Sequence, residues 1–226
     1  MQIFIDSANL KEIERWVRFG IADGVTTNPS IMLKEGISDL EKGTKEIAAI
    51  LDGKPISVEV ITDNPEEMLS QAREFSSWAK NVVIKIPIIN QFGEPCLEVI
   101  NTLENEGIRV NVTAALSFGQ MALSAKAGAT YSSIFSGRVA DEGGDPWELI
   151  SMSVEWLESW NYKTKIIVGS IRSVIDIQNA AVAGAHIITI PPQFLSKWVD
   201  HKYSRDTVKQ FMNDASKTFK NLKLKR

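Results

Sequence analysis

The sequence predicts a single α/β domain that folds as a (β/α)8 TIM barrel with an extra C-terminal helix. Short apolar, β-branched runs alternate eight times with helical patterns, and 226 residues suffice for one such barrel. No Pro/Gly/Ser-rich linker, low-complexity tract or fixed-period repeat divides the chain. An open doubly wound sheet is the alternative, but its G-x-G-x-x-G fingerprint is absent. We therefore expect one domain over residues 1–226.

The first half of the chain is expected to supply four strands. Apolar runs predict them at 2–6, 24–28, 55–61 and 82–87. The first helix, at 9–19, has one apolar face and ends at Gly20. Proline suits a first helical turn, so Pro29 is expected to open a helix that runs to about residue 51. For the same reason, Pro65 is expected to open a helix that runs to about residue 79.

The second half completes the alternation. Strands are expected at 109–114, 131–136, 165–169 and 186–190, and helices at 95–106, 120–127, 146–160, 174–183, 194–199 and about 204–220. Residues 137–145 are expected to form a polar loop, and the basic stretch 217–226 a solvated helix end. The last helix carries Phe211, Met212 and Phe219. We expect it either to cover its own barrel or to dock on a neighbouring subunit.

Composition and charge exclude several classes of function. The chain has 25 basic and 28 acidic residues without long blocks of one sign, so neither nucleic acid nor an anionic membrane is an expected partner. Neither a membrane helix nor a signal sequence is apparent, and we expect a cytoplasmic protein. Cys96, His186 and His201 are the only cysteine and histidines, which provide no metal-ligand cluster. We expect no metal and no cofactor.

Alternation along each strand separates an apolar set of side chains from a polar one. One parity, which includes Ile5, Ile84 and Val112, is almost entirely apolar, as helix-facing positions should be. The other parity carries Asp6, Asn28, Glu59, Lys85, Asn111, Thr113 and Ser133, each toward the C-terminal end of its strand. TIM-barrel enzymes place their chemistry at that end. Burying these polar groups together would be costly for stability alone, so they are expected to form an active site.

Lys85 is the expected reactive residue of this set. It lies within the apolar run 82–87, and burial disfavours the charged form of a lysine. A neutral amine is a nucleophile that forms Schiff bases with carbonyl compounds. The alternative is a lysine at a strand end that reaches solvent or forms a salt bridge. The polar neighbours expected on the same face favour the reactive role.

Seven short motifs, spread over nearly the whole chain, carry a family resemblance. They are Phe4-Ile5-Asp6-Ser7-Ala8-Asn9, Gly24-Val25-Thr26-Thr27-Asn28-Pro29-Ser30, Val58-Glu59-Val60, Ile84-Lys85-Ile86-Pro87, Asn111-Val112-Thr113, Gly137-Arg138 and Gly169-Ser170-Ile171-Arg172. In combination they resemble the small single-domain transaldolases and their relatives, the fructose-6-phosphate aldolases. The resemblance implies a class I, metal-independent mechanism in which Lys85 forms a Schiff base with a ketose. The iminium then promotes cleavage between C3 and C4 of the sugar.

The resemblance also implies roles for the residues around Lys85. Asp6 matches the carboxylate that takes the proton of the C4 hydroxyl; its alternative is to cap the following helix, for which Asn9 is better placed. Glu59 and Thr113 match the pair that positions a catalytic water, and Glu59 would also tune the protonation of the amine.

The remaining matches concern substrate binding. Asn28, Asn111 and Ser133 match contacts to the bound dihydroxyacetone unit, with satisfied polar residues of the barrel interior as the alternative. Ser170 and Arg172 lie where a strand passes into a helix N-terminus, which offers free backbone N–H groups and a positive dipole end. Arg138 adds a bidentate donor. A phosphate or another tetrahedral oxyanion would fit there, although solvated surface arginines are the common alternative.

Two positions distinguish transfer of the three-carbon unit from its release. The aldolases resemble one another in carrying Gln at position 59 and Tyr at position 135, whereas this chain has Glu59 and Phe135. Asn111 and Ser133 also follow the transaldolase pattern. We therefore expect a transaldolase that uses sugar phosphates such as fructose 6-phosphate, and the resemblance implies a homo-oligomer. An aldolase that releases dihydroxyacetone and a sugar-phosphate-binding barrel without turnover are the alternatives.

Two loops depart from the family pattern and bear on the substrate. The loop at 88–95 is longer than expected, and the loop at 139–146 carries Ala140 where the family usually has an acid. Loops at this end of a TIM barrel set specificity. A sulfonated ketose such as 6-deoxy-6-sulfofructose is therefore an alternative donor.

Overall fold

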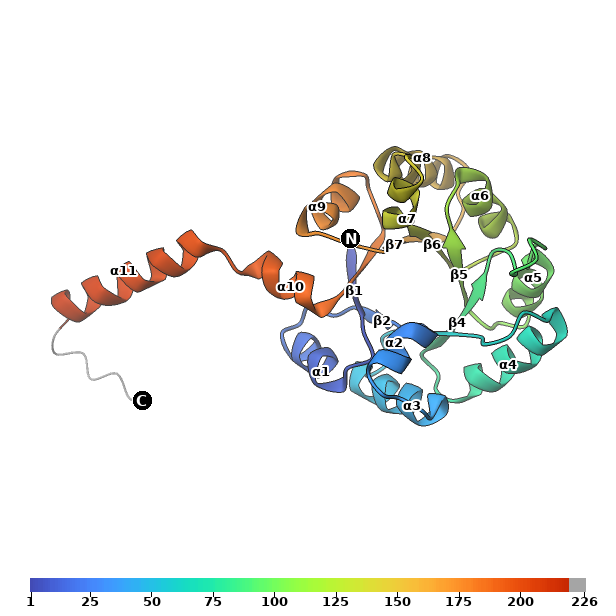
Figure 1. The fold of residues 1–226 in the computed structure, drawn as a ribbon, viewed down its shortest axis with the longest axis horizontal. Helices are drawn as coiled ribbons and strands as arrows, with labels where there is room; N and C mark the ends of the chain where they lie inside the picture. The colour runs from blue at the N-terminus through green and yellow to red at the C-terminus, as the bar shows by residue number, and fades with distance from the viewer. Residues whose placement is uncertain (220–226) are drawn as a thin grey trace.

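The chain forms a closed barrel of eight parallel strands surrounded by helices, as Figure 1 shows for the computed structural model, which describes residues 1–219. The strands follow one another in chain order, and β8 closes the barrel against β1. Their bounds are β1 Gln2–Asp6, β2 Gly24–Thr26, β3 Ile56–Glu59, β4 Val82–Pro87, β5 Val110–Ala115, β6 Tyr131–Phe135, β7 Lys165–Gly169 and β8 Ile187–Ile190. The predicted (β/α)8 barrel is confirmed.

Helices alternate with the strands along the chain, and most of them surround the barrel (Figure 1). They are α1 Leu10–Arg18, α2 Pro29–Lys34, α3 Leu40–Leu51, α4 Pro65–Ser77, α5 Leu97–Asn105, α6 Phe118–Lys126, α7 Ser136–Asp141, α8 Pro146–Ser159, α9 Val174–Val182, α10 Pro192–Val199 and α11 Lys202–Thr218. Side chains at helix N-termini accept hydrogen bonds from first-turn N–H groups that would otherwise lack partners. Asn9 does so for α1, as expected, and Asn64 and Asp145 do so for α4 and α8.

Two of the predicted elements were wrong. The helix expected at 29–51 is broken into α2 and α3, because Gly36 adopts a left-handed φ of 72° and the Asp39 side chain caps a new helix by accepting from the Lys42 N–H. The loop expected at 137–145 begins with α7, a helix of 6 residues, too short to show a hydrophobic period. This helix turns directly out of β6, where the Ser136 hydroxyl donates to the Gly169 carbonyl.

The apolar parity of the strands faces the helices, as predicted. Ile5, Ile84 and Val112 belong to one large buried cluster between the sheet and its helices. Inside the barrel, Phe4, Ile167 and Ile187 form a separate small cluster against Tyr131. On β1 and β8, the next residues of the same parity toward the C-terminal end are polar, Asp6 and Thr189.

Helix α11 extends away from the barrel, beyond α10 (Figure 1). None of its residues is buried, and Tyr203, Val208, Phe211 and Met212 are all exposed. The expectation that this helix covers its own barrel is therefore wrong. Most of the basic stretch at 217–226 lies outside the described residues. Within residues 1–219, no helix is both long and apolar enough to cross a bilayer.

Candidate active site

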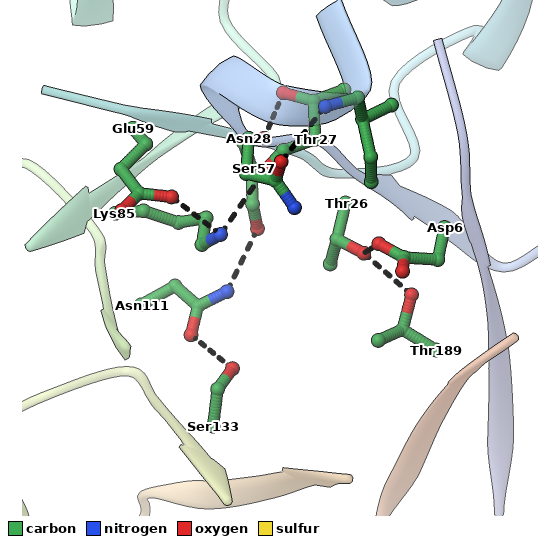
Figure 2. Close-up of polar contacts among 11 residues, drawn as sticks. Asp6, Thr26, Thr27, Asn28, Ser57, Glu59, Lys85, Asn111, Ser133 and Thr189 are labelled. Atoms are coloured by element: carbon green, nitrogen blue, oxygen red, sulfur yellow. Dashed lines mark hydrogen bonds and ion pairs between the residues drawn. The ribbon is translucent and has the colours of Figure 1, made fainter. Parts of the chain in front are cut away.

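Lys85 lies inside the barrel and is paired with a carboxylate. The strand register places Glu59 of β3 directly beside it, and its Nζ donates to Glu59 Oε2 at 2.8 Å and to the Thr27 carbonyl at 3.0 Å (Figure 2). Lys85 is only 5% exposed, so it does not reach solvent. The salt bridge foreseen as an alternative is thus present, but it lies within the predicted polar constellation.

The pair combines a proton donor, the Lys85 ammonium, with a proton acceptor, the Glu59 carboxylate. The Glu59 side chain is 23% exposed, so water can reach it, whereas the amine beside it is enclosed. Passing a proton from the ammonium to the adjacent carboxylate would give a neutral amine, which is the nucleophilic form. The ion pair can therefore generate a reactive amine without any movement of the backbone.

Asp6 belongs to a second polar group, beside the Lys85 network in Figure 2. Its Oδ1 accepts from Thr26 Oγ1 at 2.8 Å, and Thr26 Oγ1 in turn contacts Thr189 Oγ1 at 2.5 Å. Burial raises the pKa of the Asp6 carboxyl above its ordinary value, and the Thr26 hydrogen bond and the charge of Lys85 oppose this rise. Asp6 does not cap α1, because Asn9 does.

A third group of polar side chains lies deep in the barrel. Ser133 Oγ donates to Asn111 Oδ1 at 2.7 Å, and Asn111 Nδ2 donates to Ser57 Oγ at 3.1 Å (Figure 2). Thr113 Oγ1 is buried and finds no hydrogen-bond partner among the described residues. A buried hydroxyl without a partner is costly, which suits a position that binds a water or a substrate atom.

A cavity of about 200 Å³ borders all three groups, through Lys85, Asp6 and Ser133. Its walls are formed by Asp6, Thr26, Asn28, Lys85, Ser133, Phe135, Arg138, Gly169, Ser170 and Thr189. Asn28 also caps α2, with its Oδ1 accepting from the Ile31 N–H at 2.9 Å, which leaves Nδ2 as its available donor. Glu59, Asn111 and Thr113 are not among the residues that line this cavity. The structure thus brings Lys85 and Asp6 to one cavity, with Glu59 behind the lysine.

The anion end of the site differs from the expectation in one respect. The backbone N–H groups of Arg172 and Ser173 are not free, because both donate to Asp176 Oδ2 at 2.9 Å. The Arg172 guanidinium forms a bidentate pair with Asp141 and does not line the cavity. Arg138 and Ser170 do line it. An anion bound here would rely first on Arg138 and would compete with Asp141 for Arg172.

Close packing explains why position 137, in the Gly137-Arg138 motif, is a glycine. A Cβ at this position would lie 2.5 Å from the Ser170 carbonyl oxygen and 2.7 Å from Arg172 Nε. Only glycine therefore allows α7 to approach the turn after β7 so closely. This contact joins two of the sequence motifs at the anion end of the cavity.

Three functional candidates were missed from the sequence: Thr26, Ser57 and Thr189. All three are buried on the inward face of their strands and hydrogen-bond to predicted site residues or to each other. Thr26 and Ser57 precede Asn28 and Glu59 by two residues and so share their parity. Strand alternation could have identified them, but small hydroxyl side chains stand out less than a buried charge.

Sequence comparisons identify the family. A family model described as Transaldolase/Fructose-6-phosphate aldolase matches residues 3–225. A probable transaldolase from Dehalococcoides mccartyi is 40% identical over 214 residues, covering 95% of this chain and 97% of that protein. A probable transaldolase from Clostridium botulinum (strain Loch Maree / Type A3) is 42% identical over 219 residues, covering 97% and 98%.

Solved structures that resemble the chain support the fold alone. A thiamine phosphate pyrophosphorylase from Pyrococcus furiosus matches with a TM-score of 0.58 at 10% identity, covering 84% of this chain and 85% of that one. A mandelate oxidase mutant matches with a TM-score of 0.55 at 16% identity; the match covers 84% of this chain and 63% of the oxidase chain. Together with the full-length sequence matches, the barrel and its polar cavity show that the chain is an enzyme of the transaldolase/fructose-6-phosphate aldolase family.

Proposed function

We propose that this chain transfers a dihydroxyacetone unit from an anionic ketose to an aldose phosphate through a Schiff base on Lys85. The observation that carries the proposal is the Lys85 amine, which contacts Glu59 and lines a polar cavity together with Asp6. A lysine held in this way, beside a proton acceptor and facing a cavity, is suited to attack a carbonyl carbon.

The residues suggest an order of steps. Glu59 takes a proton from Lys85, and the amine attacks the C2 carbonyl; loss of water then gives the iminium. Asp6 accepts the C4 hydroxyl proton, the C3–C4 bond breaks, and its electrons move into the iminium, leaving an enamine and a free aldehyde. The enamine then attacks the acceptor aldehyde while Asp6 returns the proton. Hydrolysis of the new iminium releases the product ketose and regenerates Lys85.

Phe135 supports transfer rather than release. Free dihydroxyacetone forms only after the enamine carbon receives a proton. Phe135 lines the cavity and has no hydroxyl that could donate one. The enamine is therefore expected to persist until an aldehyde acceptor arrives, and release of dihydroxyacetone is expected to be a minor reaction.

A sulfonated ketose is a second candidate donor, favoured by the charges at the anion end. The cations Arg138 and Arg172 are accompanied there by Asp141 and Asp176, so the four charges sum to zero. A phosphate monoester carries about −1.5 to −2 at neutral pH, and a sulfonate carries one negative charge. Because this end of the cavity has no excess positive charge, a singly charged sulfonate needs less neutralisation there than a phosphate.

A donor and acceptor screen tests the proposal. With glyceraldehyde 3-phosphate or erythrose 4-phosphate as acceptor, we expect transfer to exceed release of free dihydroxyacetone, each measured separately. If the charge argument is right, 6-deoxy-6-sulfofructose has a higher kcat/KM than fructose 6-phosphate. Equal or lower efficiency would remove the sulfonate donor, and predominant release would assign the chain to the aldolases instead.

We also propose that the chain forms a homo-oligomer through α11. An exposed apolar face on a helix that leaves its own barrel is typical of an interface, and Tyr203, Val208, Phe211 and Met212 supply such a face.

Truncation tests this assembly. Removal of residues 201–226 is expected to lower the molar mass measured by size-exclusion chromatography with light scattering to that of a monomer. Removal of residues 220–226 alone serves as the control and should leave the number of subunits in the assembly unchanged. A full-length chain that is already monomeric at micromolar concentration would contradict the proposal.

A further inference from the structure

Two threonines on the strands flanking β1 lie beside the Asp6 carboxylate. Thr26 comes from β2 and Thr189 from β8, and β1 lies between these strands in the closed barrel. Both are buried, with exposures of 4% and 6%. Their hydroxyls form a continuous line with the carboxylate, from Thr189 through Thr26 to Asp6 (Figure 2).

Counting protons among these three side chains favours one direction of the line. Each hydroxyl has one proton to donate, and an ionised carboxylate only accepts. If Thr26 donates to Asp6, then Thr189 must donate to Thr26, and every proton in the line has an acceptor. If Thr26 instead donated to Thr189, Asp6 would lose its donor. The Thr189 proton would then have no acceptor among residues 1–219, where its hydroxyl contacts only Thr26.

We propose that Thr189 is a positioning residue that acts through Thr26, holding the Thr26 proton on Asp6 and so stabilising the ionised carboxylate. Hydrogen bonds in a chain polarise one another, so the Thr26 donor is stronger with Thr189 behind it than alone. Burial raises the pKa of the Asp6 carboxyl, and the hydrogen bond from Thr26 opposes that rise. The link to acid–base chemistry rests on the proposed function, whereas the effect on Asp6 itself does not.

The other charged groups around Asp6 stay constant when Thr189 is changed. Lys85 from β4 and Arg138 from α7 share the cavity with Asp6. Asp6 also borders a second cavity of about 410 Å³, whose other charged lining residues are Glu12 of α1, Lys34 of α2 and Glu35 just after it. The residues that β8 and α10 contribute to these two cavities are uncharged. A change in Asp6 titration after substitution of Thr189 therefore reports the lost hydroxyl.

Direct titration of Asp6 in the unliganded protein tests the inference. The aspartate carboxyl carbons are labelled with ¹³C and followed by NMR across pH, and the Asp6 resonance is assigned by its absence in Asp6→Asn. Thr189→Val removes the hydroxyl at nearly constant shape and is expected to raise the Asp6 pKa. Thr189→Ser keeps the hydroxyl and is expected to retain the wild-type value. Should Thr189→Val fail to fold, Thr189→Ala lacks the hydroxyl as well and carries the same expectation.

An unchanged Asp6 pKa in the variants without the hydroxyl would overturn the inference, as would an equal rise in Thr189→Ser. The pH dependence of kcat/KM gives a second readout. Cleavage needs ionised Asp6, so kcat/KM should fall in acid as Asp6 becomes protonated. This fall should occur at higher pH in Thr189→Val than in the wild type, and at the wild-type pH in Thr189→Ser. A merely structural threonine would lower activity equally at all pH values. If the wild-type chain transfers no dihydroxyacetone, the proposed function fails, while the NMR titration still decides the role of Thr189.

Discussion

Substitution of Lys85 by alanine is expected to abolish transfer of the three-carbon unit. The loss should reach roughly 10⁴-fold or more, comparable to removal of the nucleophile in other enzymes that use covalent catalysis. The reason is that no other amine can replace the Schiff base: Lys85 is the lysine among the side chains that line the cavity. Steady-state kinetics measures the loss. Borohydride treatment of the wild-type protein with ketose should leave a stable adduct on the Lys85 peptide.

Lys80→Ala is a matched control for this variant. Lys80 lies just before β4 and its side chain is exposed, so its removal should change neither turnover nor trapping. Lys85→Ala leaves Glu59 without its cation, but water can reach this partly exposed carboxylate, and we expect the fold to persist in circular dichroism. Loss of folding would indicate a structural lysine. An untrapped wild-type Lys85 would favour a sugar-phosphate-binding barrel without turnover.

Substitution of Asp6 by asparagine is expected to separate Schiff-base formation from carbon–carbon cleavage. Turnover should fall by about 10²–10⁴-fold, the usual contribution of a general acid or base. Borohydride trapping on Lys85 should persist, because the amine and Glu59 are unchanged. Asp23→Asn is the control: Asp23 accepts from the Ile3 N–H at 2.9 Å at the N-terminal end of the barrel, away from the cavity. Loss of trapping in Asp6→Asn would show that Asp6 acts before the cleavage step.

The same variant is expected to gain stability at neutral pH. Burial raises the native pKa of Asp6 above its ordinary value of 3.8, so between the unfolded and native pKa values the native state binds more protons than the unfolded state. Stability contributed by this group is therefore present at low pH and is lost as pH rises through the native pKa. Asparagine does not ionise, so the Asp6→Asn variant does not lose stability in this way as pH rises. Its Tm should exceed that of the wild type at pH 7 and the difference should shrink in acid; a lower Tm at pH 7 would contradict the argument.

Local sequence patterns predicted much of the fold and part of the candidate site. The period of two along each strand assigned Lys85, Glu59 and Asn111 to the inward face, where the structure places them. Short elements were less predictable. Helix α7 has 6 residues and no visible period, and the break before α3 depends on one left-handed glycine, Gly36, within a segment that otherwise reads as helical.

Contacts at the anion end could not be predicted from local patterns. Arg172 was expected to face an anion beside free N–H groups, but its guanidinium pairs with Asp141, and Asp176 occupies the N–H groups of Arg172 and Ser173. Arginine and aspartate side chains have several partners within reach of a helix terminus, and their choice depends on how α7 packs against the turn after β7.

The sequence by itself determined three features: eight strands that alternate with helices, the strand side chains that face the barrel interior, and the family. The first two depend on residues that are close together in the chain, and the family depends on motifs in a set order. Only the tertiary structure decided which inward side chains touch. Thr26 and Thr189 are 163 positions apart and meet because closure of the barrel brings β8 beside β1. The direction of α11, away from the barrel, was likewise visible only in the structure, where none of its residues is buried.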